Sequence, residues 1–576
     1  MCGFVAFLAS KGTPAATDHW VRCLTDVIAH RGPDDSGIWR GDQVAVGFRR
    51  LAILDLSDDS HQPMTREDER FVLVFNGEIY NYIELRRELT ALGHQFETSG
   101  DSEVLLASYR AWGEACVERL VGMFAFCIVD RVQQRLFLAR DRFGIKPLYY
   151  VQSPRGVLFA SEIKSIRASG LWNGQLNEAR FANFLVAGRT EAVQETEDTY
   201  LAGVRQLLPG EVCTVTFGGT LTRRSYIRAD PLPSVDDAHV VDGFAERFDD
   251  SIRLHLRADV PVGVLLSGGM DSVSIACSMS ALLRTSGAVT PLHAFCYLSP
   301  DFDESKQITD VQRTTGAIVH RLEDLGAREV WSRMNDVMWH HDEPVHSASV
   351  LMGFELYRFA AREGIRVVLS GQGADETQGG YYHFVENLLV TLALQGRLPS
   401  LLHQASAFAE ITGQSRAASL SQCARLVRAH VAGSFASYRR IAAGRRLQEG
   451  LGLAYLVPDF ASRARAIADE NGGQDLTSAL QRATTRSPLP HYLRAEDRNS
   501  MAHSVEARVP FLDHRLVQFV SALPAQWKMW NGWNKRVMRE AMTNRIPDSV
   551  RTRRQKFGFS TSVSRWLQHD LATSME

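Results

Sequence analysis

Short runs of apolar residues dominate the first part of the chain and predict β-strands. Residues 71–75, 124–129 and 135–139 form such runs, bounded by polar or turn-forming positions. Residues 82–92 place apolar side chains near helical spacing, which predicts a helix packed on a sheet. We therefore expect an α+β fold in this part of the chain.

The apolar pattern changes beyond Arg228. A polar, proline-containing stretch without apolar periodicity predicts a linker. After it, the continuous apolar runs 260–266 and 365–369 alternate with long helical patterns, which is typical of a parallel α/β sheet with buried strands. Residues 385–490 are rich in Leu, Ala and Arg, and we expect them to be largely helical without a catalytic pattern.

These changes divide the chain into a first domain (residues 1–228), a linker (229–238) and a second domain (239–576). The chain has 576 residues, of which 45% are hydrophobic and 23% charged. It is therefore long enough for two or more domains that each bury their own core.

Composition excludes several classes of protein. The 64 basic and 66 acidic side chains give a net charge of −2, so no electrostatic feature predicts binding to nucleic acid or to a membrane surface. The eight cysteines include no C-x-x-C pair, which argues against a zinc ribbon or a disulfide framework. No leader precedes Cys2, and no apolar run approaches the roughly 20 residues that a membrane helix needs. We expect a cytoplasmic protein.

Cys2 is the first candidate for chemistry. If Met1 is removed, Cys2 carries both a thiol nucleophile and a free α-amino group, whose ordinary pKa of roughly 7.7–8.0 lets it take the thiol proton. The alternative is a small residue that only permits the removal of Met1, and one residue alone does not decide between them.

Polar residues that suit an amide substrate lie further along the first domain. Asn76 and Gly77 follow the run 71–75, where we expect a sharp turn at a sheet edge, and an Asn amide beside a backbone N–H can donate to an oxyanion. Alone, the dipeptide is more typical of a plain turn. Arg50 can bind a carboxylate and Asp101 an α-ammonium group, although each, taken singly, is more typical of a surface charge.

A candidate phosphate site follows the apolar run 260–266. Residues 267–272, Ser-Gly-Gly-Met-Asp-Ser, lead directly into a helical pattern, so glycine N–H groups, hydroxyls and a helix N-terminus can surround a pyrophosphate. A Walker lysine is absent, which excludes a loop that delivers a γ-phosphate and favours adenylyl transfer, with Asp271 as a Mg²⁺ ligand. An ordinary Gly-Gly loop is the alternative, and the context favours the phosphate site.

A second loop with the same character follows the apolar run 365–369. Residues 370–376 again place glycines and carboxylates at the carboxyl end of a strand, which predicts one shared nucleotide pocket.

Two other charged segments carry weaker signals. Residues 340–343, His-His-Asp-Glu, lack the spacing of a metal motif. The basic run 551–556 is compatible with an anion site, but a solvated face is the more typical use of such a run.

Several longer segments occur along the chain in a fixed order: Cys2-Gly3, residues 30–34 (His-Arg-Gly-Pro-Asp), Arg50-Leu51, residues 76–81 (Asn-Gly-Glu-Ile-Tyr-Asn), 140–150, 267–272 and 506–513 (Glu-Ala-Arg-Val-Pro-Phe-Leu-Asp). In these segments the sequence resembles the glutamine-dependent asparagine synthetases over nearly its full length. The resemblance implies an Ntn-hydrolase-like glutaminase sandwich, with stacked sheets between helices, followed by an ATP-pyrophosphatase-type synthetase domain with a helical C-terminal part. It also implies an ammonia tunnel between the domains, a possible homodimer, and the use of ATP and Mg²⁺ without an organic prosthetic group.

The resemblance further implies roles for single residues. Cys2 would be the nucleophile, Asn76 and Gly77 would stabilise the oxyanion, and these two would bind glutamine together with Arg50, Glu78 and Asp101. ATP would be bound by Leu266, Ser267, Gly268, Gly269, Asp271, Ser272, Tyr297, Ser370, Gly371 and Lys535. Asp271 and Asp375 would hold Mg²⁺, and Gln372 and Asp375 would face the acceptor or its adenylate.

Gln372 departs from the pattern of this family, in which a glutamate occupies the corresponding position. A carboxylate there can accept a proton from attacking ammonia, whereas a neutral amide cannot act as a base near pH 7. Aspartate is the leading acceptor, and a carboxylate of a sugar acid, peptide or secondary metabolite is the alternative. A glutamine amidohydrolase with a vestigial ATP domain and a non-catalytic scaffold are the further alternatives.

Overall fold

The computed structural model describes residues 2–14, 16–66, 70–187, 196–228, 236–285, 287, 291–298, 303–323, 326–345, 347, 349–413, 415–432 and 475–554. The predicted linker falls mainly on residues 229–235, outside the described residues, so the domain boundary at residue 228 stays a prediction. Met1, residues 433–474 of the predicted helical segment and residues 555–576 also lie outside them.

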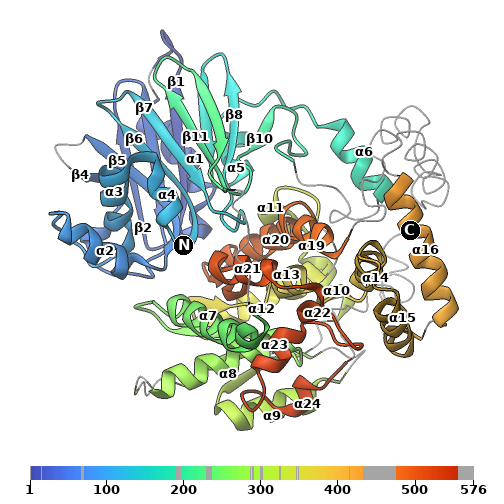
Figure 1. Ribbon diagram of the computed structural model, residues 1–576. Helices are drawn as coiled ribbons and strands as arrows, with labels where there is room; N and C mark the ends of the chain where they lie inside the picture. Colours follow the sequence, from blue (N-terminus) through green and yellow to red (C-terminus); the bar gives the residue numbers. More distant parts are fainter. Residues whose placement is uncertain are drawn as a thin grey trace.

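Two antiparallel six-stranded sheets form the body of the first domain (Figure 1). In sheet order, the first consists of β10 (Val204–Gln206), β8 (Tyr149–Ser153), β9 (Gly156–Ala160), β1 (Gly3–Ala9), β3 (Val44–Arg50) and β2 (Asp35–Arg40). The second consists of β12 (Leu221–Ser225), β11 (Glu211–Thr216), β7 (Arg135–Arg140), β6 (Gly122–Asp130), β5 (Phe71–Ile79) and β4 (Met64–Arg66).

Alternate residues of β1 belong to two different cores, because successive side chains of a strand point to opposite faces. One set packs between the two sheets: Phe4, Ala6 and Leu8. The other set packs under α1 (Asp18–Asp26) and α5 (Ile163–Ala168): Val5, Phe7 and Ala9. The helices α2 (Tyr82–Ala91) and α3 (Asp101–Trp112) cover the outer face of the second sheet. This layering confirms the predicted α+β sandwich of stacked sheets between helices.

The predicted turn at Asn76-Gly77 is wrong. Both residues lie inside β5, which continues to Ile79 and pairs Gly77 with Phe124 of β6. Gly77 has a φ of +153°, and a Cβ built on it would lie 2.1 Å from the carbonyl oxygen of Met123. The glycine is therefore needed for the close approach of two strands rather than for a change of direction.

Shorter elements complete the first domain: α4 (Cys116–Arg119), α6 (Glu178–Ala187) and the 3₁₀ turns η1 (Ala29–Arg31), η2 (Asp58–Ser60) and η3 (Gly113–Ala115).

A parallel five-stranded sheet forms the centre of the second domain, which confirms the predicted α/β fold. Its order is β15 (Ile318–Leu322), β14 (His293–Tyr297), β13 (Val262–Leu265), β16 (Val367–Leu369) and β17 (Glu506–Arg508). After β13, the strands β14 and β15 are added on one side of β13, and the later strands β16 and β17 are added on its other side. The carboxyl ends of β13 and β16 therefore form the switch point at which open α/β sheets bind ligands.

Helices cover both faces of this sheet. One face packs against α7 (Val240–His255), α8 (Met270–Thr285) and α9 (Ser305–Thr315), and the other against α12 (Ser349–Arg362). The described part of the predicted helical segment is helical: α14 (Phe384–Leu394), α15 (Leu398–Thr412), α16 (Arg416–Ala432) and α19 (Leu476–Thr485) share a core of their own. The remaining elements are η5 (Asp237–His239), α10 (Ala327–Ser332), α11 (Met334–His341), α13 (Ala374–Gln378), α20 (Leu489–Met501), η8 (Pro510–Leu512), α21 (His514–Ala522), α22 (Ala525–Lys528), α23 (Arg536–Ala541) and α24 (Asp548–Arg551).

No helix in the described part of the chain combines the length and the apolar character needed to cross a membrane.

Buried ion pairs join the two domains at Arg31. Its guanidinium donates to both carboxylate oxygens of Asp497 in α20, at 2.8 and 3.1 Å, and to Glu162 Oε1 at 2.7 Å. Its Nε donates to the carbonyl oxygen of Cys2 at 3.0 Å. Burial opposes the charge of Arg31, but the carboxylates of Asp497 and Glu162 outweigh it and raise the pKa of the guanidinium. One side chain thus fixes Cys2 against the second domain.

Arg31→Ala leaves buried Asp497 with Lys146, at 3.6 Å, as its remaining ion-pair partner among the described residues, whereas Glu162 keeps Arg498 at 2.7 Å. Because removing one member of a buried ion pair leaves its partner poorly compensated, we expect a loss of about 3 kcal/mol in the free energy of unfolding. The shift of the urea unfolding midpoint, followed by tryptophan fluorescence, measures the loss.

Arg40→Ala is the matched control, because Arg40 pairs with Asp18 while 43% and 66% of their side chains are exposed. An exposed pair contributes less than about 1 kcal/mol. Equal midpoints for the two variants would contradict the role given to Arg31.

Candidate active sites in the two domains

Cys2 is buried immediately before β1, between the two sheets. Its N–H donates to Asn76 Oδ1 at 3.2 Å, and its Sγ lies 4.0 Å from the carbonyl oxygen of Leu51. Burial raises the pKa of the thiol, while the charges of Glu78 and Arg50 act on it in opposite directions. The thiol therefore needs a nearby base to become a nucleophile, as the amine of an N-terminal cysteine would be.

Asn76 places a free donor beside this thiol. Its Oδ1 is occupied by the N–H of Cys2, whereas its Nδ2 is buried and has no hydrogen-bond partner among the described residues. A buried amide donor without a partner costs free energy unless a ligand accepts from it. An oxyanion formed by attack of Cys2 Sγ on a carbonyl carbon would be such an acceptor.

The predicted glutamine-binding residues surround the same place. Arg50 is buried at the end of β3, and its guanidinium donates to the carbonyl oxygens of Ser57 (2.8 Å) and Asp55. Asp101 is buried at the start of α3, and its Oδ2 accepts from the N–H of Ile79 at 2.8 Å.

Both carboxylates among the predicted glutamine-binding residues, Glu78 and Asp101, lie where burial disfavours their charged form. Burial and the neighbouring carboxylate of Glu506 raise the pKa of Glu78 well above its usual range. Burial raises the pKa of Asp101 to about 6. Glu78 Oε2 also lacks a hydrogen-bond partner among the described residues. A cationic ligand group would stabilise both carboxylates in their ionised form.

The first predicted phosphate loop lies between β13 and α8. Ser272 Oγ accepts from the N–H of Ser267 at 3.0 Å, and Ser267 Oγ accepts from the N–H of Gly269 at 3.2 Å. The N–H of Gly268 donates to Glu304 Oε2 at 2.9 Å. An anionic oxygen thus already sits on the loop, which shows that its backbone suits an anion.

Opposite this loop, a buried lysine lies between two aspartates. Lys535 Nζ lies 2.5 Å from Asp271 Oδ1 and 2.6 Å from Asp375 Oδ1. Burial opposes the charge of Lys535, but the two aspartates outweigh it and raise its pKa. The three side chains bring together Asp271 of the first loop and Asp375 of the second, as the sequence predicted for a shared pocket.

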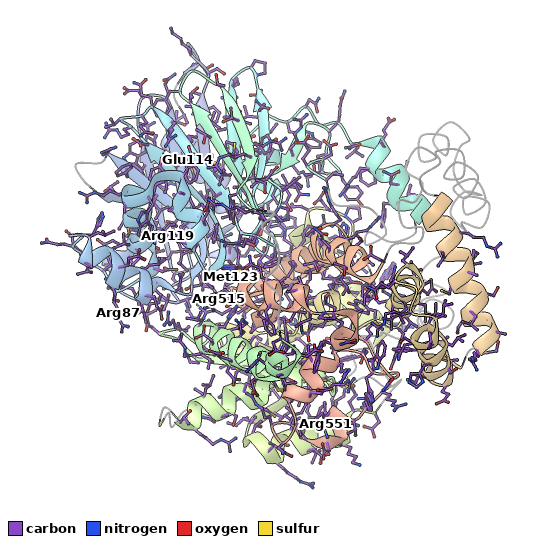
Figure 2. The ribbon with its side chains drawn as sticks, viewed as in Figure 1. Arg87, Glu114, Arg119, Met123, Arg515 and Arg551 are labelled. Atoms are coloured by element: carbon purple, nitrogen blue, oxygen red, sulfur yellow. The ribbon has the colours of Figure 1, made fainter. Side chains whose placement is uncertain are left out.

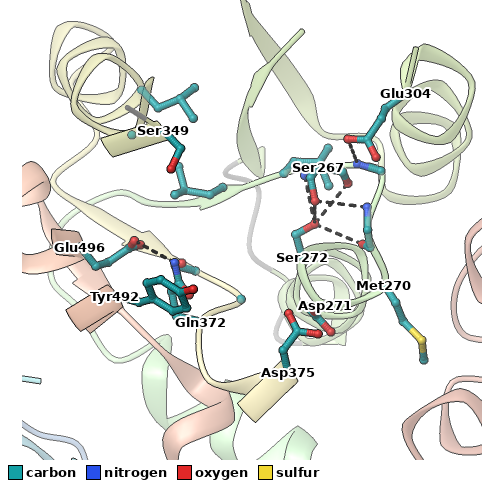
Figure 3. Close-up of a pocket in the computed structure, with 18 of the residues that line it drawn as sticks. Ser267, Met270, Asp271, Ser272, Glu304, Ser349, Gln372, Asp375, Tyr492 and Glu496 are labelled. Atoms are coloured by element: carbon teal, nitrogen blue, oxygen red, sulfur yellow. Dashed lines mark hydrogen bonds between the residues drawn. The ribbon is translucent and has the colours of Figure 1, made fainter. Parts of the chain in front are cut away.

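A cavity of about 480 Å³ joins the two loops at the switch point (Figure 3). All predicted ATP-binding residues except Tyr297 line it, as do Gln372 and Asp375. Tyr297, at the end of β14, packs partly buried against two hydrophobic clusters instead. Ser349, Gln372, Tyr492 and Glu496 lie on the side of the cavity away from the first loop.

Sequence reasoning missed several residues of this cavity. Glu304 and Glu496 are single carboxylates without a motif. Glu304 reaches the cavity from the residue before α9, and Glu496 reaches it from α20. The basic run is divided: Arg553 lines the cavity and pairs with Glu304 at 3.0 Å, whereas Arg551 pairs with Asp548 at the margin of the molecule (Figure 2). Its last residues, from 555 onward, lie outside the described residues.

The histidines of residues 340–343 serve the fold. His341 Nε2 lies 2.9 Å from Asn499 Oδ1, and His340 packs edge-on against His30. Among the described residues, no group of three or more His, Cys, Asp and Glu side chains could hold a metal ion by itself.

Arg508 of β17 connects the two sites. Its Nη2 lies 3.7 Å from Glu78 Oε2, and its carbonyl oxygen accepts from the N–H of Ser370 at 2.8 Å. The same residue therefore contacts a predicted glutamine-binding residue and the first residue of the second predicted nucleotide loop.

Comparisons with known proteins match this division of the chain. A family model described as a glutamine amidotransferase domain matches residues 1–227, and one described as asparagine synthase matches residues 243–576. The glutamine-hydrolyzing asparagine synthetase 1 of Bacillus subtilis (strain 168) is 32% identical over 592 residues, spanning 99% of this chain and 88% of that protein. Amidase chry2 of Gibberella zeae is 29% identical over 606 residues, spanning 96% of this chain and 87% of that protein.

Gly380→Ala tests the arrangement around Lys535. A Cβ at this position would lie 1.8 Å from Asp375 Oδ1 and 2.4 Å from Lys535 Cε, so the substitution must displace both side chains. We expect binding of ATP with Mg²⁺ to weaken about tenfold, which corresponds to about 1.4 kcal/mol. Titration with a fluorescent ATP analogue measures the dissociation constant.

Gly326→Ala provides the control, since a Cβ there would meet no atom within 4 Å. If both alanine variants bind the analogue equally well, the aspartates and Lys535 do not form the nucleotide site.

Proposed function

Because the chain belongs to the glutamine-hydrolysing asparagine synthetase family, we propose that it converts aspartate to asparagine with ATP and the amide nitrogen of glutamine. The chain is a glutamine-dependent ligase, and the acceptor is the part that is proposed. The observation that carries the proposal is the physical connection through Arg508 between a buried cysteine site and a nucleotide cavity.

Glutamine hydrolysis would begin at Cys2 after removal of Met1. The α-amino group takes the thiol proton, and Sγ attacks the side-chain amide carbon of glutamine. Asn76 Nδ2 and the N–H of Gly77 stabilise the oxyanion. The carbon–nitrogen bond then breaks, ammonia leaves with the returned proton, and water hydrolyses the thioester to glutamate.

The glutamine itself would be held by charge. Its α-ammonium group suits Glu78 and Asp101, because a cation restores the ionised state that burial disfavours. Its α-carboxylate suits the guanidinium of Arg50. These roles agree with Glu78 Oε2, which is buried and lacks a hydrogen-bond partner among the described residues.

In the second domain the acceptor carboxylate would attack the α-phosphorus of ATP, and the α–β bond would break to release pyrophosphate. The first loop and Lys535 bind and orient the phosphates. Asp271 and Asp375 would hold Mg²⁺, since two converging carboxylates completed by phosphate oxygens are a ligand set that this ion prefers, and the ion supplies charge neutralisation when bound. Ammonia from Cys2 would then reach the adenylate through an internal passage.

Gln372 supports a second candidate acceptor. A relative bears the name amidase chry2, and the cavity carries a neutral amide where the familiar asparagine synthetases carry a carboxylate. The same chemistry on a carboxylate other than aspartate would fit both observations. The intact phosphate loops argue against a hydrolase with a vestigial ATP domain.

Location and assembly are parts of the same proposal. All eight cysteines are free, which fits a reducing cytoplasm. The homodimer implied by the resemblance stays a prediction.

Incubation with glutamine, ATP, Mg²⁺ and aspartate tests the acceptor. We expect asparagine, glutamate, AMP and pyrophosphate in equal amounts, measured by amino-acid chromatography and pyrophosphate release. Glutamate without asparagine or AMP would contradict aspartate as the acceptor, and a panel of other carboxylates read by AMP release would then identify the second candidate.

Two cysteine variants show where the nitrogen originates. Cys2→Ala should make asparagine only when ammonium is added, because the amide-forming site is intact. Cys23→Ala removes an exposed free thiol of the same domain and should behave like the unaltered enzyme. Glutamine-driven synthesis by Cys2→Ala would rule out Cys2 as the nucleophile.

A further inference from the structure

Amide formation on an adenylate produces a proton that the cavity must remove. When ammonia attacks the acyl carbon, the nitrogen becomes positively charged and must lose a proton before the amide is complete. Gln372, in the second loop, lines the cavity, but its neutral amide cannot take that proton.

Glu496 of α20 lies beside Gln372 and lines the same cavity. Gln372 Nε2 lies 3.5 Å from Glu496 Oε2, and Figure 3 shows the two side chains pointing toward one another. The hydroxyl of Tyr357 in α12 donates to Glu496 Oε1. The carboxylate thus accepts from neutral donors of different elements.

The other cavity carboxylates are committed elsewhere. Asp271 and Asp375 pair with Lys535, and Glu304 accepts from Gly268 and pairs with Arg553 at the phosphate loop. By contrast, Glu496 forms no ion pair with any basic side chain among the described residues.

We propose that Glu496 is the general base of amide formation and replaces the carboxylate that Gln372 lacks. The proposal rests on the function proposed above. The nitrogen lone pair of ammonia forms the bond to the acyl carbon, and one N–H proton passes to the Glu496 carboxylate. The bond from that carbon to the phosphate oxygen then breaks, AMP leaves with its electron pair, and Glu496 releases the proton to solvent.

The neighbours of Glu496 favour this role. Burial raises its pKa, while hydrogen bonds from Tyr357, Ser370 and Gln372 and the charge of Lys146 lower it. The balance leaves a carboxylate that is more basic than an exposed glutamate, so it accepts protons more readily near neutral pH.

Its place in the fold also suits the arrival of ammonia. The next residue of α20, Asp497, binds Arg31, and Arg31 holds the carbonyl oxygen of Cys2. Glu496 is therefore one residue away in α20 from the contact that joins the second domain to the glutaminase domain.

Glu496→Gln is the direct test, because it keeps the shape and removes the base. We expect aspartate-dependent exchange of labelled pyrophosphate into ATP to stay within about twofold of the unaltered enzyme, while asparagine formation from ammonium falls about 10²–10⁴-fold. Glutamine hydrolysis should be unchanged, which also shows that the variant is folded. Glu410→Gln, at an exposed position of α15, is the control and should alter neither rate.

Tyr357→Phe gives an independent readout. Its hydroxyl lowers the pKa of Glu496, so its removal should raise that pKa and move the acid limb of the pH–rate profile for asparagine formation to higher pH. A purely structural role of Glu496 predicts no such movement.

Different results would contradict the proposed function and the proposed role of Glu496. An unaltered enzyme without aspartate-dependent exchange would contradict the proposed function. Glu496→Gln that forms asparagine at the ordinary rate, or that loses exchange together with amide formation, would overturn the role of Glu496 as a base.

Discussion

The position of Arg31 is the constraint on which the two-site arrangement depends. A buried guanidinium is tolerated only when carboxylates and carbonyl groups satisfy it, and here they come from both domains: Asp497 from one, Glu162 and the carbonyl of Cys2 from the other. Because every partner must be in place at once, the contact fixes Cys2 relative to α20. The neighbouring Glu496 is thereby fixed relative to the glutaminase site.

The two sites differ in how far basic side chains compensate their carboxylates. In the glutaminase site, buried Glu78 and Asp101 have raised pKa values, and Asn76 keeps an unpaired donor, so the site is completed by its ligand. In the cavity of the second domain the carboxylates already have basic partners: Lys535 lies between two aspartates, and Glu304 pairs with Arg553. Entry of the triphosphate would exchange these internal partners for phosphate contacts. Glu496 differs from both groups, since only neutral donors hold it.

Sequence patterns predicted those parts of the fold and site that are local along the chain. Several strands, the helix α2 and both strand–loop segments follow from apolar runs and glycines, whereas the stacking of two sheets was implied only by the family resemblance. The strand through Asn76-Gly77 was not predicted, because its cause is the close approach of Met123 from another strand. The position of Glu496 in the cavity was not predicted for a related reason. It lies 124 positions from Gln372 in the sequence, and no spacing rule spans such a distance. Tyr297 does not line the cavity, and its role in ATP binding stays a prediction.

In the proposed function, the buried contacts of Arg31 between the domains make the nitrogen released at Cys2 available to the adenylate. The most direct measurement supplies glutamine labelled with ¹⁵N in its side-chain amide together with an excess of unlabelled ammonium, and follows the isotope in the amide product by mass spectrometry. If the sites are connected as described, the product retains most of the ¹⁵N despite the excess. Dilution of the label to the proportion in the bulk solution would contradict the account.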